Sequence, residues 1–328
     1  MYLRGKNIKI VLVLLVASVI LLLNSCNAPR ENPLDPDSAD NHLGTIEGMV
    51  ETFSLPYTPI ENVEIIWKPG NMLVYSDKYG NFSFTNVKTE DGPLIFRKDG
   101  YHPDTVQVVW AGTRKISEQV NLNKIPTVDS LFIYSSVTNT SNPPGSMSEL
   151  VIKTKITDID NDIDTVFVVN DQLELNKAMD FNVASKTFET ELTSEELNLT
   201  DLEQSVGLQF NFRVRDVLGE SYLLNGGSVK RVIKDQVTGM MPANDQVITS
   251  VPFDLTWTGF TSGYSFTYMI EIYTNDGSQL ILSADNIPSQ VTKYAVNSLD
   301  SGNYYWVIWI IDDFNDMARS VPATFSVQ

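Results

Sequence analysis

From Gly44 onward, apolar and polar residues alternate along most of the chain in short segments. Each segment is bounded by Gly, Pro, Asn or Asp, which are the residues that favour turns. Alternation with a period of two places every second side chain on one face of a strand, so that this face can be buried. Many short strands separated by turns are typical of β-sandwiches. The pattern therefore predicts an all-β chain.

The predicted strands fill more sequence than one sandwich needs, because such domains usually hold ~100 residues. Two breaks in the pattern divide them, at residues 124–127 and 234–244. We therefore expect three β-sandwich domains in series after a lipoprotein signal peptide and a flexible tether. The predicted segments are a signal peptide at 1–25, a lipidated cysteine and tether at 26–43, and sandwiches at 44–125, 126–235 and 236–328.

The first residues of the chain have a different pattern. Arg4, Lys6 and Lys9 precede an apolar run at 10–23, which is interrupted only by Ser18. A helix that spans a membrane needs roughly 20 apolar residues, and this run is shorter. The basic start and the short apolar run therefore predict a signal peptide instead of a transmembrane segment.

The apolar run leads into Leu23-Asn24-Ser25-Cys26, and Cys26 is the only cysteine of the chain. This sequence resembles the lipobox of bacterial lipoproteins, with a polar Asn24 as its departure from the pattern. The resemblance implies cleavage before Cys26, a diacylglycerol on its thiol and an acylated amine. Two or three acyl chains anchor a protein stably in a membrane. The alternative is a free cysteine within a signal peptide that is cut elsewhere.

The residue after Cys26 bears on localisation. Asn27 stands where inner-membrane lipoproteins of enteric bacteria have Asp. The resemblance to lipoproteins therefore favours the outer membrane of a bacterial cell envelope. Both the periplasmic and the outer face remain open.

The first predicted domain contains four signatures in a fixed order. They are Gly44-Thr45-Ile46-Glu47-Gly48-Met49-Val50, Val63-Glu64-Ile65, Asp77-Lys78-Tyr79-Gly80-Asn81-Phe82-Ser83-Phe84 and Lys98-Asp99-Gly100-Tyr101. This order resembles the carboxypeptidase regulatory-like domain, which is a seven-stranded, transthyretin-like sandwich. The resemblance implies a non-catalytic domain in which glycines serve turns and aromatic side chains fill the core. We expect Phe82 and Phe84 to share one face of a strand.

The middle domain contains a dense acidic run between two predicted strands. The carboxylates at alternate positions of this run are those of Asp158, Asp160, Asp162 and Asp164. Hard oxygen ligands at this density could hold Ca²⁺, which takes roughly six to eight of them. The run lacks the glycine and the final glutamate of an EF-hand loop. The alternative is a polar turn, and the stretch resembles a turn of bacterial Ig-like modules.

The last domain resembles a fibronectin type III or Ig-like domain. Its sequence Leu299-Asp300-Ser301-Gly302-Asn303-Tyr304-Tyr305 implies, through this resemblance, that Tyr305 is the tyrosine corner. Residues 304–311 are apolar at every position. If Tyr305 faces the core, alternation turns four other side chains outward. These are Tyr304, Trp306, Ile308 and Ile310.

An outward-facing apolar strip of this kind usually marks an interface. Three occupants remain open for it: a neighbouring domain, an envelope protein, or a glycan whose sugar rings stack on Tyr and Trp. Burial of the strip between domains would remove the only support for glycan binding.

Composition excludes several functions. The chain has 328 residues and a formal net charge of −18, which argues against nucleic-acid binding because such binding needs a basic surface. One cysteine excludes a disulfide framework, and two histidines leave little material for catalysis by histidine. The sequence has no P-loop, dinucleotide-binding, zinc-protease or nucleophile-elbow motif.

These observations predict a protein that is not an enzyme and needs no cofactor, with Ca²⁺ as the one candidate ion. We expect a lipid-anchored envelope protein that presents binding or scaffold modules to an envelope protein or a glycan. The alternative is a surface lipoprotein that binds glycans through the apolar strip. A cryptic hydrolase built on a carboxylate pair is the less favoured alternative.

Overall fold

The computed structural model describes residues 42–328, which fold almost entirely into β-strands. These residues form strands β1–β23 and two short 3₁₀ turns, and they contain no α-helix. They divide into two compact units, the first ending at Asn123 and the second spanning Lys124–Gln328. The all-β prediction is confirmed. The predicted signal peptide, Cys26 and nearly all of the tether lie outside the described residues.

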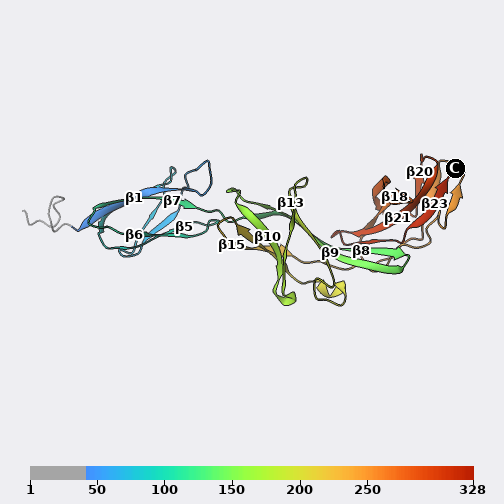
Figure 1. Ribbon diagram of the computed structural model, residues 1–328, viewed down its shortest axis with the longest axis horizontal. Helices are drawn as coiled ribbons and strands as arrows, with labels where there is room; N and C mark the ends of the chain where they lie inside the picture. The colour runs from blue at the N-terminus through green and yellow to red at the C-terminus, as the bar shows by residue number, and fades with distance from the viewer. Residues whose placement is uncertain (1–41) are drawn as a thin grey trace, which may run out of the picture. The chain divides into compact units, whose positions relative to one another are not determined.

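The first unit is a sandwich whose two sheets form separate layers in Figure 1. One sheet has the order β4-β1-β7, and the other has the order β3-β2-β5-β6. The strands are β1 (Leu43–Thr52), β2 (Glu64–Trp67), β3 (Met72–Tyr75), β4 (Asn81–Lys88), β5 (Gly92–Arg97), β6 (Asp104–Val108) and β7 (Lys115–Leu122). Phe82 and Phe84 both point into the core, with 5% and 1% of their surface exposed. Their predicted shared face is confirmed.

The first and last strands of this sandwich are neighbours. β1 pairs with β7 in parallel, from Thr45 opposite Lys115 to Thr52 opposite Leu122. Gly44 permits the buried ring of Trp110 to approach β1, because a Cβ at this position would lie 2.3 Å from a ring carbon. The strand count agrees with the predicted seven-stranded sandwich. Membership of the carboxypeptidase regulatory-like family stays a prediction.

The second unit contains two hydrophobic cores. The core nearer in sequence to the first unit lies among β8 (Thr127–Ser141), β9 (Pro144–Thr157), β10 (Ile163–Asn170), β11 (Leu175–Ala178), β12 (Asp180–Asn182), β13 (Thr187–Thr193), β14 (Phe210–Asp216) and β15 (Ser221–Gly227), with 3₁₀ turns at Asp171–Leu173 and Leu202–Ser205. The other core lies among β16 (Gln246–Ile248), β17 (Phe253–Thr256), β18 (Phe266–Thr274), β19 (Leu280–Pro288), β20 (Lys293–Val296), β21 (Gly302–Asp312), β22 (Met317–Arg319) and β23 (Ala323–Val327).

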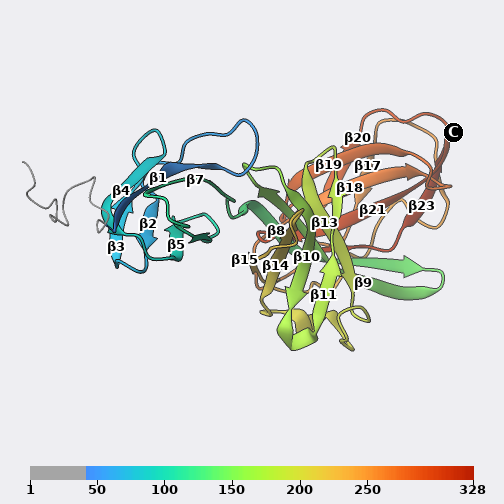
Figure 2. The same cartoon turned by 60° about the vertical axis from the view of Figure 1, so that its left-hand side comes forward.

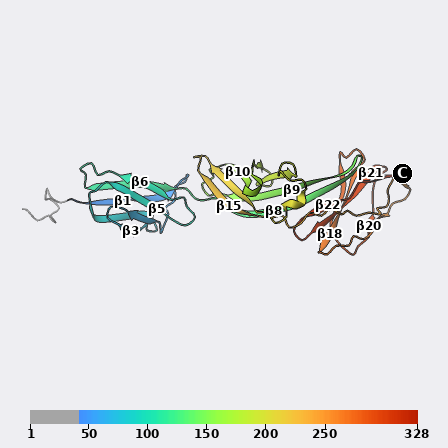
Figure 3. The ribbon, with the colours of Figure 1, turned by 90° about the horizontal axis from the view of Figure 1, so that it is seen from below.

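The β8–β9 hairpin contributes to both cores. Leu131 and Ile133 of β8 pack against the first core, whereas Val137 belongs to the second. The far part of β8 pairs in parallel with β22, so one sheet runs β12-β13-β9-β8-β22-β21-β18-β19. Figure 2 shows the green hairpin projecting alongside the orange and red strands, and Figure 3 shows the same approach from below. A hairpin of the predicted middle domain therefore extends a sheet of the predicted last domain.

A buried carboxylate fastens the two halves of this unit. Asp316 has no exposed surface, and it accepts hydrogen bonds from the backbone N–H of Ser135 (2.7 Å) and of Arg231 (3.1 Å). Burial raises the pKa of Asp316 to about 6. The Arg231 side chain pairs with Asp312 at 2.9 Å and lies over the ring of Tyr264. These contacts hold the β21–β22 turn against β8.

Candidate functional site

The predicted outward strip on β21 lies in the core. Trp306, Ile308 and Ile310 have no exposed surface, and Tyr304 is 7% exposed. The Trp306 indole N–H donates to the Pro242 carbonyl at 2.9 Å, within the second core. The prediction that Tyr304, Trp306, Ile308 and Ile310 form an exposed binding strip was wrong.

The tyrosine corner explains the error. The Tyr304 hydroxyl, not that of Tyr305, donates to the Asp300 carbonyl at 3.0 Å. Moving the assignment by one residue turns every side chain of a strand to the opposite face. An uninterrupted apolar run contains no polar residue that could have corrected the choice.

The opposite face of β21 carries a set of interlocked side chains. The rings of Tyr273 and Tyr305, on paired strands, stack with their centroids 5.2 Å apart and their planes at 15°. The Trp309 indole N–H donates to Glu271 at 2.8 Å, and Arg319 lies 5.8 Å from the Trp309 ring centre. We call this surface the aromatic face, made of Glu271, Tyr273, Tyr305, Trp309 and Arg319.

Electrostatics within the aromatic face are internally balanced. Glu271 accepts from Trp309 and also hydrogen-bonds to the Tyr273 hydroxyl, while Arg319 lies against Trp309. Partial burial, together with the Glu271 carboxylate, raises the pKa of Tyr273 to about 12. Tyr273 therefore stays protonated, and the face carries one acidic and one basic side chain.

A signal in the sequence could have located this face. β18 has Tyr268, Ile270 and Ile272 fully buried, and Glu271 lies between two of them. A carboxylate in the middle of an apolar strand marks its outward side, because an unpaired buried charge is costly. Knowledge that β18 pairs with β21 would then have placed Tyr305 and Trp309 on the same outward side.

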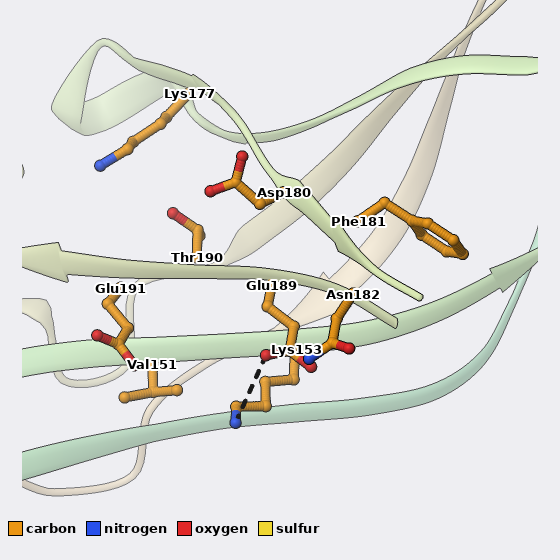
Figure 4. Close-up of a pocket in the computed structure, with 9 residues that line it drawn as sticks. All are labelled: Val151, Lys153, Lys177, Asp180, Phe181, Asn182, Glu189, Thr190 and Glu191. Atoms are coloured by element: carbon orange, nitrogen blue, oxygen red, sulfur yellow. Dashed lines mark ion pairs between the residues drawn. The ribbon is translucent and has the colours of Figure 1, made fainter. Parts of the chain in front are cut away.

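A polar groove, shown in Figure 4, lies on the described surface of the second unit. It has a volume of about 500 Å³ and lies over β9, β13 and β12, with Lys177 of β11 at its rim. Lys153 pairs with Glu189 across it at 3.7 Å, and the side chain of Phe181 points away from its centre. Hydrogen bonds from the Thr187 and Ser185 hydroxyls lower the pKa of Glu189. A carboxyl group with a lowered pKa is a poor proton donor. Glycoside hydrolysis requires a good proton donor, so Glu189 does not suit that role.

The acidic run divides among separate environments. Asp164 pairs with Arg215 at 2.8 Å, and Asp160 accepts the Lys124 backbone N–H at 2.7 Å. Burial, followed by a side-chain hydrogen bond with Asp162, raises the pKa of Asp158 to about 7. Among residues 42–328 no group of three or more His, Cys, Asp or Glu side chains is placed to hold a metal ion. The structure thus gives the predicted Ca²⁺ site at Asp158, Asp160, Asp162 and Asp164 no support.

Turn chemistry accounts for part of this run. Four five-residue turns share one pattern. Each begins with an Asp whose side chain accepts a hydrogen bond from the backbone N–H two residues later, and the residue after that N–H adopts the left-handed conformation. The left-handed residues of the four turns are Gly80 (φ 76°), Asn161 (54°), Gly219 (89°) and Asn315 (68°). Gly and Asn are the residues that tolerate this conformation. Asp158 therefore has the same structural role as Asp77, Asp216 and Asp312.

In the part of the chain that the structure describes, no helix is long and apolar enough to cross a membrane. No family model matches the sequence, and no curated protein matches it.

Solved structures that match this chain include a pilin subunit and fibronectin-type modules. The Bacillus cereus major pilin subunit BcpA is 11% identical, with 87% of this chain and 96% of that chain covered and a TM-score of 0.29. The fibronectin(III)-like modules of Clostridium thermocellum CbhA are 15% identical, with 62% and 93% covered and a TM-score of 0.30. The FN1–FN3 domains of chicken CNTN1 are 8% identical, with 81% and 90% covered and a TM-score of 0.31.

Proposed function

We propose that this chain is a non-catalytic, lipid-anchored protein of the bacterial outer membrane that presents β-sandwich modules for binding or scaffolding. The observation that carries the proposal is the position of Cys26. The only cysteine of the chain follows a basic start and a short apolar run, with Leu23 three residues before it and Ser25 directly before it.

The described residues supply a second support. They form strands whose side chains fill separate hydrophobic cores, and the polar groove on their surface contains a carboxylate with a lowered pKa. A rigid fold of this type suits presentation of a surface to a partner.

The anchor can be tested by the intact mass of the full chain extracted from membranes of a Gram-negative host. We expect the mass of residues 26–328 plus acyl chains. Cys26→Ser should keep the signal peptide and carry no acyl chain, whereas the matched control Ser25→Ala, with another small residue, should be processed normally. An unmodified thiol at Cys26 in the wild type would overturn the anchor.

The face of the membrane can be tested on the same cells with an added protease. Digestion of the lipidated protein on intact cells would place the modules outside. Protection on intact cells, followed by digestion after the outer membrane is permeabilised, would place them in the periplasm and direct the search for partners there.

A further inference from the structure

The side chains of the aromatic face are held in place before any ligand arrives. Tyr273 and Tyr305 restrain each other by stacking, and Trp309 is restrained by its hydrogen bond to Glu271 and by Arg319. Val307 lies between Tyr305 and Trp309 on this face and still has no exposed surface, so its neighbours close over it. Side chains that are already ordered lose little entropy on binding, which favours affinity.

The surface continues beyond β21. β22 pairs with β8, and residues of β8 that alternate with the core positions point to the same outward side as Arg319. Two of these are aromatic: Tyr134 is partly exposed, and Phe132 is 51% exposed. The sheet runs without a break from β8 through β22 and β21 to β18, and it carries outward aromatic side chains on β18, β21 and β8. A row of this length suits an extended chain better than a small ligand.

Charge restricts the occupant. The aromatic face carries one acidic side chain, Glu271, and one basic side chain, Arg319, so their formal charges offset each other and the face has no net charge to attract a charged partner. The whole chain has a formal net charge of −18, which repels anionic polymers and other copies of the same chain. A neutral ligand that presents apolar ring faces and hydroxyl groups matches both the aromatic surface and the hydrogen-bonding groups.

We propose that the aromatic face binds a neutral polysaccharide. The proposal deepens the binding role proposed above and is independent of the lipid anchor. Pyranose rings contact Trp309 and the tyrosines, and their hydroxyls hydrogen-bond to Glu271 and Arg319.

The five tryptophans provide a local probe. Trp67, Trp110, Trp257 and Trp306 are at most 5% exposed, so Trp309 is the one that solvent reaches. Acrylamide, a neutral quencher, will therefore report mainly on the aromatic face. The full chain is kept in a polyoxyethylene detergent, which has no sugar headgroup. It is titrated with hydroxyethylcellulose, galactomannan and dextran, and with anionic polygalacturonate.

We expect at least one of the three neutral polysaccharides to protect Trp309 from quenching, and polygalacturonate to leave it accessible. Tyr305→Ala keeps the reporter and should weaken the protecting interaction about tenfold or more, as loss of a packed aromatic anchor does. Tyr79→Ala removes a tyrosine that is 59% exposed in the first unit and should bind like the wild type. If Tyr305→Ala proves unstable by near-ultraviolet circular dichroism, Glu271→Gln replaces it and should also weaken binding.

Three results would overturn the proposal. One is that none of the three neutral polysaccharides protects Trp309. The second is equal protection in the wild type and in a folded aromatic-face variant. The third is protection that depends on protein concentration without polysaccharide, which would assign the face to a second copy of the chain. The mass of the lipidated protein is unaffected by any of these results, so the anchor and the glycan site fail separately.

Discussion

Ionisation of Asp158 is opposed by burial and by the neighbouring Asp162 carboxyl, and its pKa is raised to about 7. Since the unfolded value is about 3.9, the fold favours the protonated form. The stabilising contribution of this group is complete below about pH 4 and is lost as the pH rises through about 7. Asp158→Asn imitates the protonated carboxyl, so its free energy of unfolding should fall less than that of the wild type over this range. Urea unfolding at several pH values measures the difference.

Asp77 begins an equivalent turn and provides the control. Hydrogen bonds from the backbone N–H groups, led by that of Asn81, lower its pKa. Its contribution is therefore present above the unfolded pKa and is lost as the pH falls through the folded pKa. Asp77→Asn should lower the free energy of unfolding at neutral pH and leave it unchanged in acid. If the free energies of unfolding of the two variants changed with pH in the same way, the causes given for the two pKa shifts would be contradicted.

Trp306 and Trp309 lie three residues apart and should respond differently to truncation. Trp306 fills the core, so Trp306→Ala should lower the free energy of unfolding by about 3–5 kcal/mol. Trp309 is partly exposed, and Trp309→Ala should cost about 1 kcal/mol, a common value for a single mutation. Urea denaturation of both variants tests which face of β21 is buried. A larger loss of unfolding free energy for Trp309→Ala than for Trp306→Ala would refute the assignment.

At the scale of single elements, two of the recurring turns can be compared through their glycines. Gly80 (φ 76°) and Gly219 (φ 89°) both adopt the left-handed conformation. A Cβ at Gly80 would lie 2.4 Å from the Val50 carbonyl oxygen, whereas a Cβ at Gly219 meets nothing within 4 Å. Gly219→Ala should cost about 1 kcal/mol from backbone strain alone, and Gly80→Ala should cost clearly more. Thermal unfolding ranks the two, and equal losses would show that β1 moves aside at no cost.

The sequence predicted an element correctly where local signals determine its structure. Alternation and turn residues were enough for β4, where Phe82 and Phe84 face the core. They failed on β21, because all residues of its apolar run could be buried. Which of its two faces is buried depends on how the sheets pack, and the local sequence does not show this. The parallel pairing of Ser136 with Met317 joins positions far apart in the sequence, and no local pattern indicates it. The aromatic face was missed for the same reason, since it forms only when β18, β21 and β22 are side by side.

At the scale of the whole molecule, the shared hairpin has a thermodynamic consequence. β8 contributes to both cores of the second unit, so melting one core removes a strand from the other. We expect calorimetry of the full chain to resolve two transitions, one for each unit, because packed elements that share a core unfold together. A third transition, with the cores of the second unit melting separately, would contradict this.

Asp316 provides a way to shift one of these transitions. Asp316→Ala leaves the buried N–H groups of Ser135 and Arg231 without their acceptor. Each unsatisfied group costs about 1–3 kcal/mol, so the free energy of unfolding of the variant should fall by about 2–6 kcal/mol. Only the transition of the second unit should move to lower temperature, and that of the first unit serves as the internal reference.

The parallel pairing of β1 with β7 determines how the first unit responds to force. The two strands run side by side over eight residue pairs, with the chain entering at the start of this ladder and leaving at its end. Pulling on the two ends therefore slides the strands along each other, and all hydrogen bonds of the ladder bear the load together instead of opening one at a time. The pairing of β16 with β23 has the same parallel sense near the end of the chain. A protein tethered at one end and attached to a partner at the other would resist tension on its first unit through the β1–β7 pair.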